Sequence, residues 1–194
     1  MKKRINFIIG TKMSKILEID NEILLRQLEL DDYKDIFKTI NNQRRYLGQW
    51  LPFVEFTRKP DDSKEFVEMT INLPEDRFEY VFTIRCENQF VGLIGFKCTD
   101  KQNKKTEIGY WLSEIFQGRG IVTKSVKQLC DFAFNELGIN RVQIKCAVGN
   151  EKSKFIPKRL GFTFEGIERD GELLSGNRFT DIETYSKLKR DETD

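Results

Sequence analysis

Two glycines flank an arginine in the stretch from Gln117 to Val122, which reads QGRGIV. The stretch stands where a strand-like run gives way to a helix-like run, and a simple turn there needs one glycine at most. Amide groups at the start of a helix have no partner within the helix, and glycines let a ligand come close to them. The spacing therefore indicates a cradle for a phosphate or pyrophosphate group. The alternative is a glycine-rich turn that caps the helix and binds nothing.

Two better-known phosphate-binding motifs do not fit this stretch. The chain lacks the Gly-x-x-x-x-Gly-Lys-Ser/Thr pattern of a P-loop and the Gly-x-Gly-x-x-Gly pattern of dinucleotide-binding folds. The preceding strand also ends a series of hairpins, whereas a dinucleotide site opens on a βαβ unit. A pyrophosphate site of another kind is therefore the remaining interpretation.

The chain contains no histidine. It therefore lacks the commonest general base and metal ligand, and it has no Ser-His or Cys-His nucleophile. The spacing of its four cysteines includes no Cys-x-x-Cys pair and predicts no metal site; they are Cys86, Cys98, Cys130 and Cys146. Three of the four lie in apolar runs and are predicted to be buried free thiols in a reducing cytosol. Proton transfer must then use Glu, Asp, Tyr, Lys, Cys or water.

Composition limits the class of protein. The chain has 33 basic and 31 acidic side chains, and its net charge of +2 argues against a dedicated nucleic-acid binder. A hydrophobic content of 39% with 16 phenylalanines is enough for one substantial core. The first apolar run meets Lys12 and Lys15 too soon for a signal peptide or a membrane span. We therefore expect a soluble cytoplasmic protein without a membrane partner.

Hydrophobic periodicity predicts a mixed α/β (α+β) chain with one sheet and flanking helices. Strands are predicted over residues 23–28, 79–85, 90–98, 104–112, 140–148, 161–168 and 178–188. Helices are predicted after Asp31 or Asp32, after Asp61 or Asp62, over 123–137 and from Asn150 to Leu160, and 169–177 is predicted as a turn. We expect a flexible extension over residues 1–15 and a single domain over 16–190.

The glycine stretch resembles the Q/R-x-x-G-x-G/A acyl-CoA pyrophosphate motif of GNAT N-acetyltransferases. Further segments resemble the Rim-type (RimJ/RimL-like) ribosomal-protein N-acetyltransferase branch, namely EIGYWL, FQGRGIVTKSV, AFNELGINRVQIKCAVGNEKS, IPKRLGF and EGIERDGEL. The likeness extends from about Ile23 to Leu188 and is strongest after Glu107. Val122 departs from the motif because it replaces a final small residue. The backbone N–H is unchanged there, so we expect CoA binding to be retained.

This resemblance implies a GNAT fold, with a mostly antiparallel sheet of about seven strands. Its fourth and fifth strands would splay apart, and acetyl-CoA would bind between them as co-substrate, without a metal. The backbone that offers contacts to the acetyl-pantetheine arm would be that of Ile108, Gly109, Tyr110, Trp111 and Leu112. The pyrophosphate would bind to the amides of Gln117, Gly118, Arg119, Gly120, Ile121, Val122 and Thr123. The strand over 143–148 would form the other wall.

Acetyl transfer to an amine requires that the acceptor lose a proton, because an ammonium group has no lone pair. The resemblance implies Glu107 as the base, since the glutamate base of the family often occupies this strand. The alternative is that Glu107 is an exposed strand carboxylate that pairs with Lys104 or Lys105.

The leaving CoA thiolate must also be neutralised. Many GNAT proteins use a tyrosine for this, but Pro157 occupies the place of that tyrosine here. The Rim-type branch uses the serine of an Asn-x-x-Ser motif, which is present as Asn150 to Ser153. The resemblance therefore implies contact between Ser153 and the sulfur. The resemblance also places Asn150 among the cofactor-binding residues, and Asn150 is predicted to cap the helix as well.

The sequence says less about the residues that contact the acceptor amine. The segment RRYLGQWLPF resembles the acceptor loop of the family, so Tyr46 and Trp50 are candidates to line the approach of the amine; alternatively, Trp50 and Phe53 belong to the core. Residues 52–79 hold eight acidic and four basic side chains. This excess favours a cationic acceptor, although a solvated helix face has the same composition.

These features favour an acetyl-CoA-dependent N-acetyltransferase, an acyltransferase that acts on a protein N-terminal α-amine such as that of a ribosomal protein. Two alternatives keep the acyl-CoA: an N-acetyltransferase of a polyamine, an aminoglycoside or an amino acid, and a catalytically silent acyl-CoA-binding module. A nucleotide-binding regulator is supported by the glycine turn alone. The sequence leaves open the acceptor, the physiological acyl group and the oligomeric state, a homodimer included.

Overall fold

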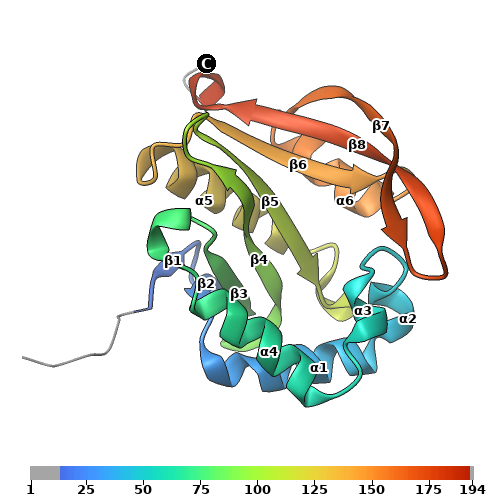
Figure 1. The fold of residues 1–194 in the computed structure, drawn as a ribbon. Coiled ribbons are helices and arrows are strands. Elements are labelled where there is room, and N and C mark those ends of the chain that lie inside the picture. The colour runs from blue at the N-terminus through green and yellow to red at the C-terminus, as the bar shows by residue number, and fades with distance from the viewer. Residues whose placement is uncertain (1–13, 193–194) are drawn as a thin grey trace, which may run out of the picture.

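The computed structural model describes residues 14–192 as one eight-stranded sheet with helices on both faces (Figure 1). The strands are β1 (Ile16–Glu18), β2 (Ile23–Gln27), β3 (Val81–Cys86), β4 (Gln89–Asp100), β5 (Lys105–Leu112), β6 (Arg141–Ala147), β7 (Thr163–Leu174) and β8 (Arg178–Leu188). The helices are α1 (Tyr33–Asn42), α2 (Arg44–Leu47), α3 (Phe53–Phe56), α4 (Pro60–Ile71), α5 (Ile121–Asn135) and α6 (Glu151–Arg159). The strand order is β1-β2-β3-β4-β5-β6-β8-β7.

The pairing of β5 with β6 differs from every other pairing in this sheet because the two strands are parallel. They pair at three positions, from Lys105 opposite Arg141 to Glu107 opposite Gln143. Beyond Glu107 the strands diverge, as Figure 1 shows between the labels β5 and β6. The predicted separation of these strands, the fourth and fifth of the expected sheet, is therefore confirmed.

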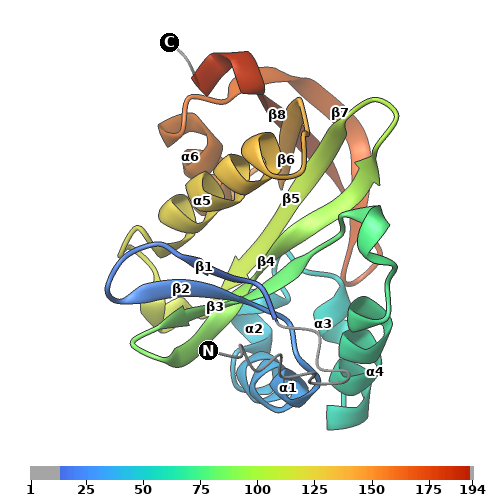
Figure 2. The same cartoon turned by 90° about the vertical axis from the view of Figure 1, so that its left-hand side faces the viewer.

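Each face of the sheet has its own core. Successive side chains of a strand point to opposite faces, and on β5 the side chains of Ile108 and Leu112 pack with α5, whereas Trp111 packs with α1 and α4. Figure 2 shows α5 and α6 on one side of the sheet and α1 on the other. By this alternation, Tyr110 faces the side of α5 and α6, and Glu107 faces the side of α1 and α4.

Three details of the predicted elements are corrected. The sheet has eight strands instead of about seven because β1 adds a short edge strand, and α5 begins two residues early, at Ile121. The predicted turn over 169–177 is strand as far as Leu174. Asp170 and Gly171 there belong to an irregularity between Glu168 and Glu172, and not to a chain reversal. Turn-type residues can make a bulge as well as a turn, so composition alone does not separate the two.

Several other expectations concern the ends and the thiols. Residues 1–13 of the predicted extension lie outside the described residues, whereas the Ser14 hydroxyl donates to Glu29 at 2.7 Å. Cys86, Cys130 and Cys146 are buried free thiols as predicted, and Cys98 is exposed. Between residues 14 and 192, no helix has the length and apolar character needed to cross a membrane.

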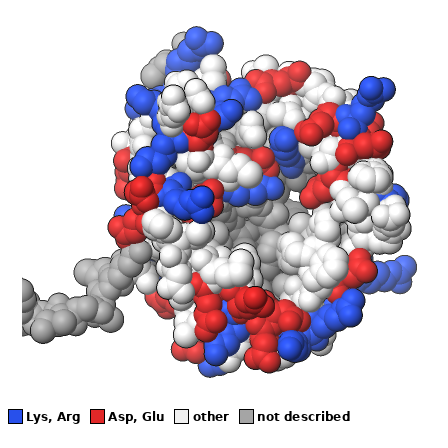
Figure 3. All heavy atoms as spheres, viewed as in Figure 1, with Lys and Arg blue, Asp and Glu red and all other residues white. Residues whose placement is uncertain are grey.

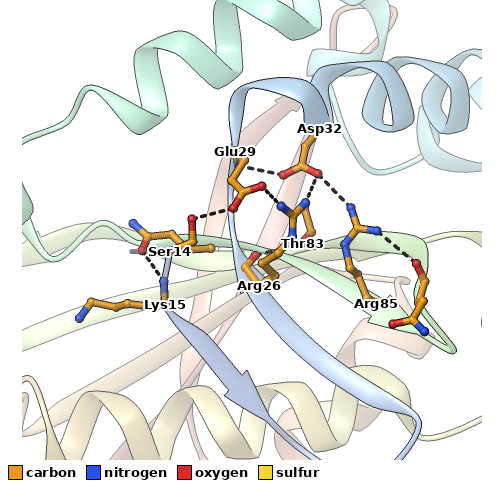
Figure 4. Close-up of polar contacts among 9 residues, drawn as sticks. Ser14, Lys15, Arg26, Glu29, Asp32, Thr83 and Arg85 are labelled. Atoms are coloured by element: carbon orange, nitrogen blue, oxygen red, sulfur yellow. Dashed lines mark hydrogen bonds and ion pairs between the residues drawn. The ribbon is translucent and has the colours of Figure 1, made fainter. Parts of the chain in front are cut away.

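A buried carboxylate connects α1 to the sheet (Figure 4). Asp32 is 3% exposed and accepts hydrogen bonds from Arg26 of β2, from Arg85 of β3 at 3.0 Å and from the Glu29 amide at 2.8 Å. Burial raises the pKa of Asp32, although both guanidinium groups oppose that rise. The arginines thus stabilise the ionised carboxylate, and the start of α1 is held against β2 and β3.

We expect Asp32→Ala to lower the free energy of unfolding by about 3 kcal/mol, because it removes the buried carboxylate that two partly buried guanidinium groups share. Asp32→Asn should cost less, since its amide oxygen still accepts a hydrogen bond. Urea unfolding followed by circular dichroism measures both. The control is Asp31→Ala, because the exposed Asp31 pairs with Lys34 at the surface and its loss should change little. Equal losses from Asp31→Ala and Asp32→Ala would contradict this role for Asp32.

Candidate active site

A cleft of about 670 Å³ opens where β5 and β6 diverge. Four segments that are far apart in the sequence line it: the loop that includes Tyr46 and Trp50, the end of β5, the glycine turn and the start of α6. Figure 3 shows that the face seen in Figure 1 is hollowed near its centre. The divergence of the two strands therefore creates a space in which an extended ligand can reach both faces of the sheet.

The glycine turn has the backbone that its sequence indicates. Gly118 and Gly120 have φ angles of +75° and +73°, in the left-handed region that favours glycine. An added Cβ at either position would meet no atom within 4 Å, so these glycines serve the backbone conformation and open access rather than tight packing. Gly120 is the N-cap of α5, and the first amides of a helix have no intrahelical acceptor. The turn thus presents amide groups beside the cleft.

Most of the predicted cofactor-binding residues line the cleft: Tyr110, Trp111, Leu112, Gln117, Gly118, Gly120, Ile121, Val122, Thr123, Asn150 and Ser153. Ile108 is instead buried in the core beside α5, and Gly109 follows it on β5 outside the cleft lining. The Arg119 guanidinium lies over the Phe116 ring, 5.0 Å from its centre, and not in the cleft wall. The Gln117 amide donates to the Glu114 carbonyl at 3.1 Å, so this amide is already engaged.

Ser153 lies in the first turn of α6. The Asn150 side chain accepts a hydrogen bond from the Ser153 amide at 3.3 Å, which confirms the predicted helix cap. The Ser153 hydroxyl oxygen lies 3.1 Å from the Tyr110 hydroxyl and 3.4 Å from the Cys146 sulfur. Burial raises the pKa of the Cys146 thiol to about 11 and also raises the pKa of Tyr110. Both groups are therefore neutral near pH 7, and Ser153 stands between two neutral partners.

Glu107 stands at the last paired position of β5 and β6, and its side chain is 7% exposed. One carboxylate oxygen lies 2.8 Å from the ammonium nitrogen of Lys97, and the other accepts from Gln143 at 3.2 Å. Burial lowers the pKa of Lys97, but the Glu107 carboxylate outweighs burial, so that pKa lies above its usual value. The alternative of an exposed carboxylate paired with Lys104 or Lys105 is therefore wrong: Lys97 stands directly opposite Glu107 on β4.

The predicted acceptor loop, which includes Tyr46 and Trp50, reaches across the cleft. Tyr46 accepts a hydrogen bond from the Gln117 side chain, and the Gln117 side-chain oxygen accepts from Lys152 of α6 at 2.6 Å. Trp50 reaches Gly149, where an added Cβ would lie 3.6 Å from ring carbon Cη2. Both predicted substrate residues, Tyr46 and Trp50, therefore line the cleft.

The alternative that Trp50 and Phe53 belong to the core is wrong for Phe53, which is 40% exposed. Sequence reasoning also missed contacts that hold this loop. Gln43 donates to the Ser113 hydroxyl at 2.8 Å and accepts from the Glu114 amide at 2.9 Å. It missed Lys152 and the side chain of Tyr110 too. No local pattern could have indicated these contacts, because their partners lie 35 to 71 positions away in the chain.

The Acetyltransferase (GNAT) domain family matches residues 22–163. This chain belongs to the GNAT acetyltransferase family. YdaF of Bacillus subtilis, provisionally named a ribosomal N-acetyltransferase, is 36% identical over 180 residues, which cover 90% of this chain and 95% of YdaF. The ribosomal-protein-serine acetyltransferase of Escherichia coli is 27% identical over 176 residues, which cover 91% of this chain and 98% of that enzyme. A solved structure of RimL, a ribosomal L7/L12 alpha-N-protein acetyltransferase in complex with coenzyme A, has a TM-score of 0.85 at 27% identity and covers 90% of this chain and 98% of RimL.

Membership of the family confirms the predicted fold and the predicted class of enzyme, an acyl-CoA-dependent acetyltransferase whose co-substrate is acetyl-CoA. The structure fits that co-substrate, because an open cleft runs from the helix N-terminus at Gly120 to the start of α6. In the part of the chain that the structure describes, no group of three or more Cys, Asp and Glu side chains is placed to hold a metal ion.

Acetyl-CoA should raise the melting temperature of this acetyltransferase, because a ligand that binds the folded state stabilises it. We expect Gly120→Val to abolish this shift, since a branched side chain in the left-handed region strains the turn and covers its amides. The matched control is Gly138→Val at the other end of α5, where φ is +66° and no atom lies within 4 Å of an added Cβ. Gly138→Val should strain its turn similarly and keep the ligand-induced shift. If Gly120→Val keeps the shift as well, the phosphate cradle lies elsewhere.

Proposed function

We propose that this enzyme transfers the acetyl group of acetyl-CoA to the N-terminal α-amine of a ribosomal protein in the cytoplasm. The observation that carries the proposal is the likeness, over about nine tenths of the chain, to a ribosomal-protein-serine acetyltransferase and to RimL. The likeness also covers nearly all of each relative, so the acceptor side is included in it. We also take residues 16–190 as one catalytic domain, because β1 to β8 form one sheet.

Charge on the acceptor side supports a cationic acceptor. Eight acidic and four basic side chains lie between residues 52 and 79, a segment that includes α3 and α4. Figure 3 shows acidic side chains, with basic ones among them, along the lower edge of this face, the region of α4 in Figure 1. A negative surface raises the local concentration of a positively charged N-terminus and so speeds its association.

The two proposed catalytic groups approach the gap between β5 and β6 from opposite faces of the sheet. Glu107 lies on the side of α1 and α4, at the last residue pair before the strands diverge. Ser153 lies on the side of α6, beside Cys146. Such an arrangement suits a displacement in which the amine arrives from one side and the thiol leaves on the other. We therefore propose that Glu107 accepts the proton that the acceptor amine loses, and that Ser153 donates a hydrogen bond to the leaving sulfur.

The bonds that change follow from this assignment. The amine nitrogen bonds to the thioester carbonyl carbon, and the carbon–sulfur bond breaks with its electron pair on sulfur. Glu107 receives the proton that the amine loses, directly or through a water molecule. Ser153 donates a hydrogen bond to the thiolate as its charge develops. The ammonium group of Lys97, 2.8 Å from one carboxylate oxygen of Glu107, holds this side chain at the point where the strands diverge.

A screen of acceptors tests the proposed function. We expect CoA-thiol release, measured with a thiol reagent, to be at least about tenfold faster with N-terminal ribosomal-protein peptides than with spermidine or aminoglycosides, because the assigned site serves an α-amine at the end of a chain. The matched control is the same peptide with a formylated N-terminus, which has no free α-amine. Faster release with a polyamine or an aminoglycoside would move the enzyme to the small-molecule class. Release that never exceeds the rate without acceptor would indicate a silent acyl-CoA-binding module.

Glu107→Gln keeps the shape of the side chain and removes the base. We expect the rate at neutral pH to fall about 10²-fold, within the usual range for general-base catalysis, with the Kd for acetyl-CoA little changed. The rate should recover in part at high pH, because the acceptor amine then loses its proton to solvent. A pH–rate profile of each variant measures this.

The matched control for Glu107→Gln is Glu165→Gln. Glu165 is also a strand carboxylate in an ion pair, since it accepts from Arg141 at 2.6 Å, and like Glu107 it lies outside the cleft lining. It differs from Glu107 because it lies on β7 and not at the point where β5 and β6 diverge. This control should keep the parental profile. A parental profile for Glu107→Gln would remove Glu107 from the mechanism.

A further inference from the structure

We propose that Tyr110 is a positioning residue for acetyl transfer, whose phenol holds the oxygen of Ser153 so that the serine proton is directed at the leaving sulfur. The inference rests on the role proposed above for Ser153. It extends that role by assigning a function to a side chain of another element, β5, whose backbone alone was expected to contact the co-substrate.

The contact between Tyr110 and Ser153 crosses the gap between the diverging strands. The Tyr110 hydroxyl lies 3.1 Å from the Ser153 hydroxyl oxygen and donates to the Ser153 carbonyl at 3.2 Å. Both residues line the cleft. One phenol therefore fixes both the backbone and the side chain of Ser153 relative to β5, in the region where the two strands no longer hydrogen-bond to each other.

The count of protons decides the direction of these bonds. A phenol and a serine hydroxyl each have one proton to donate. The Ser153 hydroxyl donates its proton to the Cys146 sulfur, 3.4 Å away, so it accepts in its contact with Tyr110. Burial raises the pKa of Tyr110, so the phenol keeps its one proton and shares it between the Ser153 hydroxyl oxygen and the Ser153 carbonyl.

The hydrogen bond from Ser153 to the Cys146 sulfur is weak, and a hydrogen bond from Ser153 to the CoA thiolate can replace it. A thiol sulfur is a poor acceptor, whereas hydrogen bonds to an ionised acceptor are roughly twice as strong as neutral ones. Ser153 can therefore turn its proton from Cys146 to the CoA sulfur as negative charge develops there. The hydrogen bond that Ser153 accepts from Tyr110 polarises its O–H group and makes it a better donor.

Tyr110 itself does not supply the proton. Loss of its proton would leave a phenolate in a buried position, which burial opposes, as the raised pKa of Tyr110 shows. Its contribution is alignment of Ser153. This role predicts that loss of the Tyr110 hydroxyl lowers the rate of acetyl transfer as long as Ser153 has its own hydroxyl. Once the Ser153 hydroxyl is removed, loss of the Tyr110 hydroxyl should have little further effect on that rate.

A double-mutant cycle of Tyr110→Phe and Ser153→Ala tests the proposal under single-turnover conditions with the best acceptor of the parent enzyme. We expect Tyr110→Phe to lower the rate of acetyl transfer about five- to tenfold, in line with the loss of one hydrogen bond, with the Kd for acetyl-CoA changed less than about twofold. In the Ser153→Ala background the same change should cost less than about twofold. With an acyl donor whose leaving thiol is more acidic, the deficit of Tyr110→Phe should shrink.

The matched control is Tyr185→Phe. Tyr185 is also a buried tyrosine, and its hydroxyl donates to Glu183 at 2.6 Å rather than to Ser153. This variant should keep the parental dependence on the leaving thiol.

Equal losses from Tyr110→Phe in both backgrounds would show that Tyr110 acts through packing, which overturns the proposal and leaves the function of the enzyme intact. A parental rate for Ser153→Ala overturns both the role of Ser153 and that of Tyr110. A preferred acceptor that is not a peptide overturns the proposed acceptor alone.

Discussion

The three-residue parallel pairing between β5 and β6 is the constraint on which the rest of the site depends. Parallel strands need a crossover connection, and here that connection contains both the glycine turn and α5. Hydrogen bonding between β5 and β6 stops at Glu107 and Gln143, so beyond these residues the facing edges of the two strands are not paired with each other, although each strand stays paired with its other neighbour. A thioester placed in the gap can then be reached from both faces, which a continuously paired sheet would prevent.

The absence of histidine shapes the chemistry of the site. A histidine could have served as base or acid near neutral pH without strong perturbation of its pKa. In the proposed mechanism the two tasks are instead divided between Glu107 and Ser153. The Glu107 carboxylate raises the pKa of Lys97 and keeps that ammonium group charged, whereas burial keeps Tyr110 and Cys146 neutral around Ser153. An ion pair thus lies on the side of Glu107, whereas the groups around Ser153 are neutral.

The supports of the site are distributed through the whole chain. Asp32 holds the start of α1 against the sheet, and Gln43 connects the end of that helix to Ser113 after β5. Tyr46, Gln117 and Lys152 then connect the acceptor loop to the glycine turn and to α6. Three walls of the cleft are therefore joined by side-chain hydrogen bonds.

The sequence by itself determined the elements and the backbone conformation of the glycine turn. Local periodicity predicts α5 and the strands around it, and the glycines of the turn are needed for a backbone conformation that is decided within a few residues. The resemblance of motifs then predicted the fold, the separation of the two central strands and the class of enzyme. The elements and the glycine turn depend on short-range backbone preferences, which a single sequence displays directly.

The tertiary structure alone decided how the side chains of the site are partnered. Lys97, and not Lys104 or Lys105, meets Glu107 because the register of β4 against β5 places it there, and a shift of one residue would point it to the other face. Likewise, Tyr110 meets Ser153 because α5 and β6 return the chain to the gap after 43 residues. Contacts of this kind depend on how distant elements pack, and no local pattern records that packing.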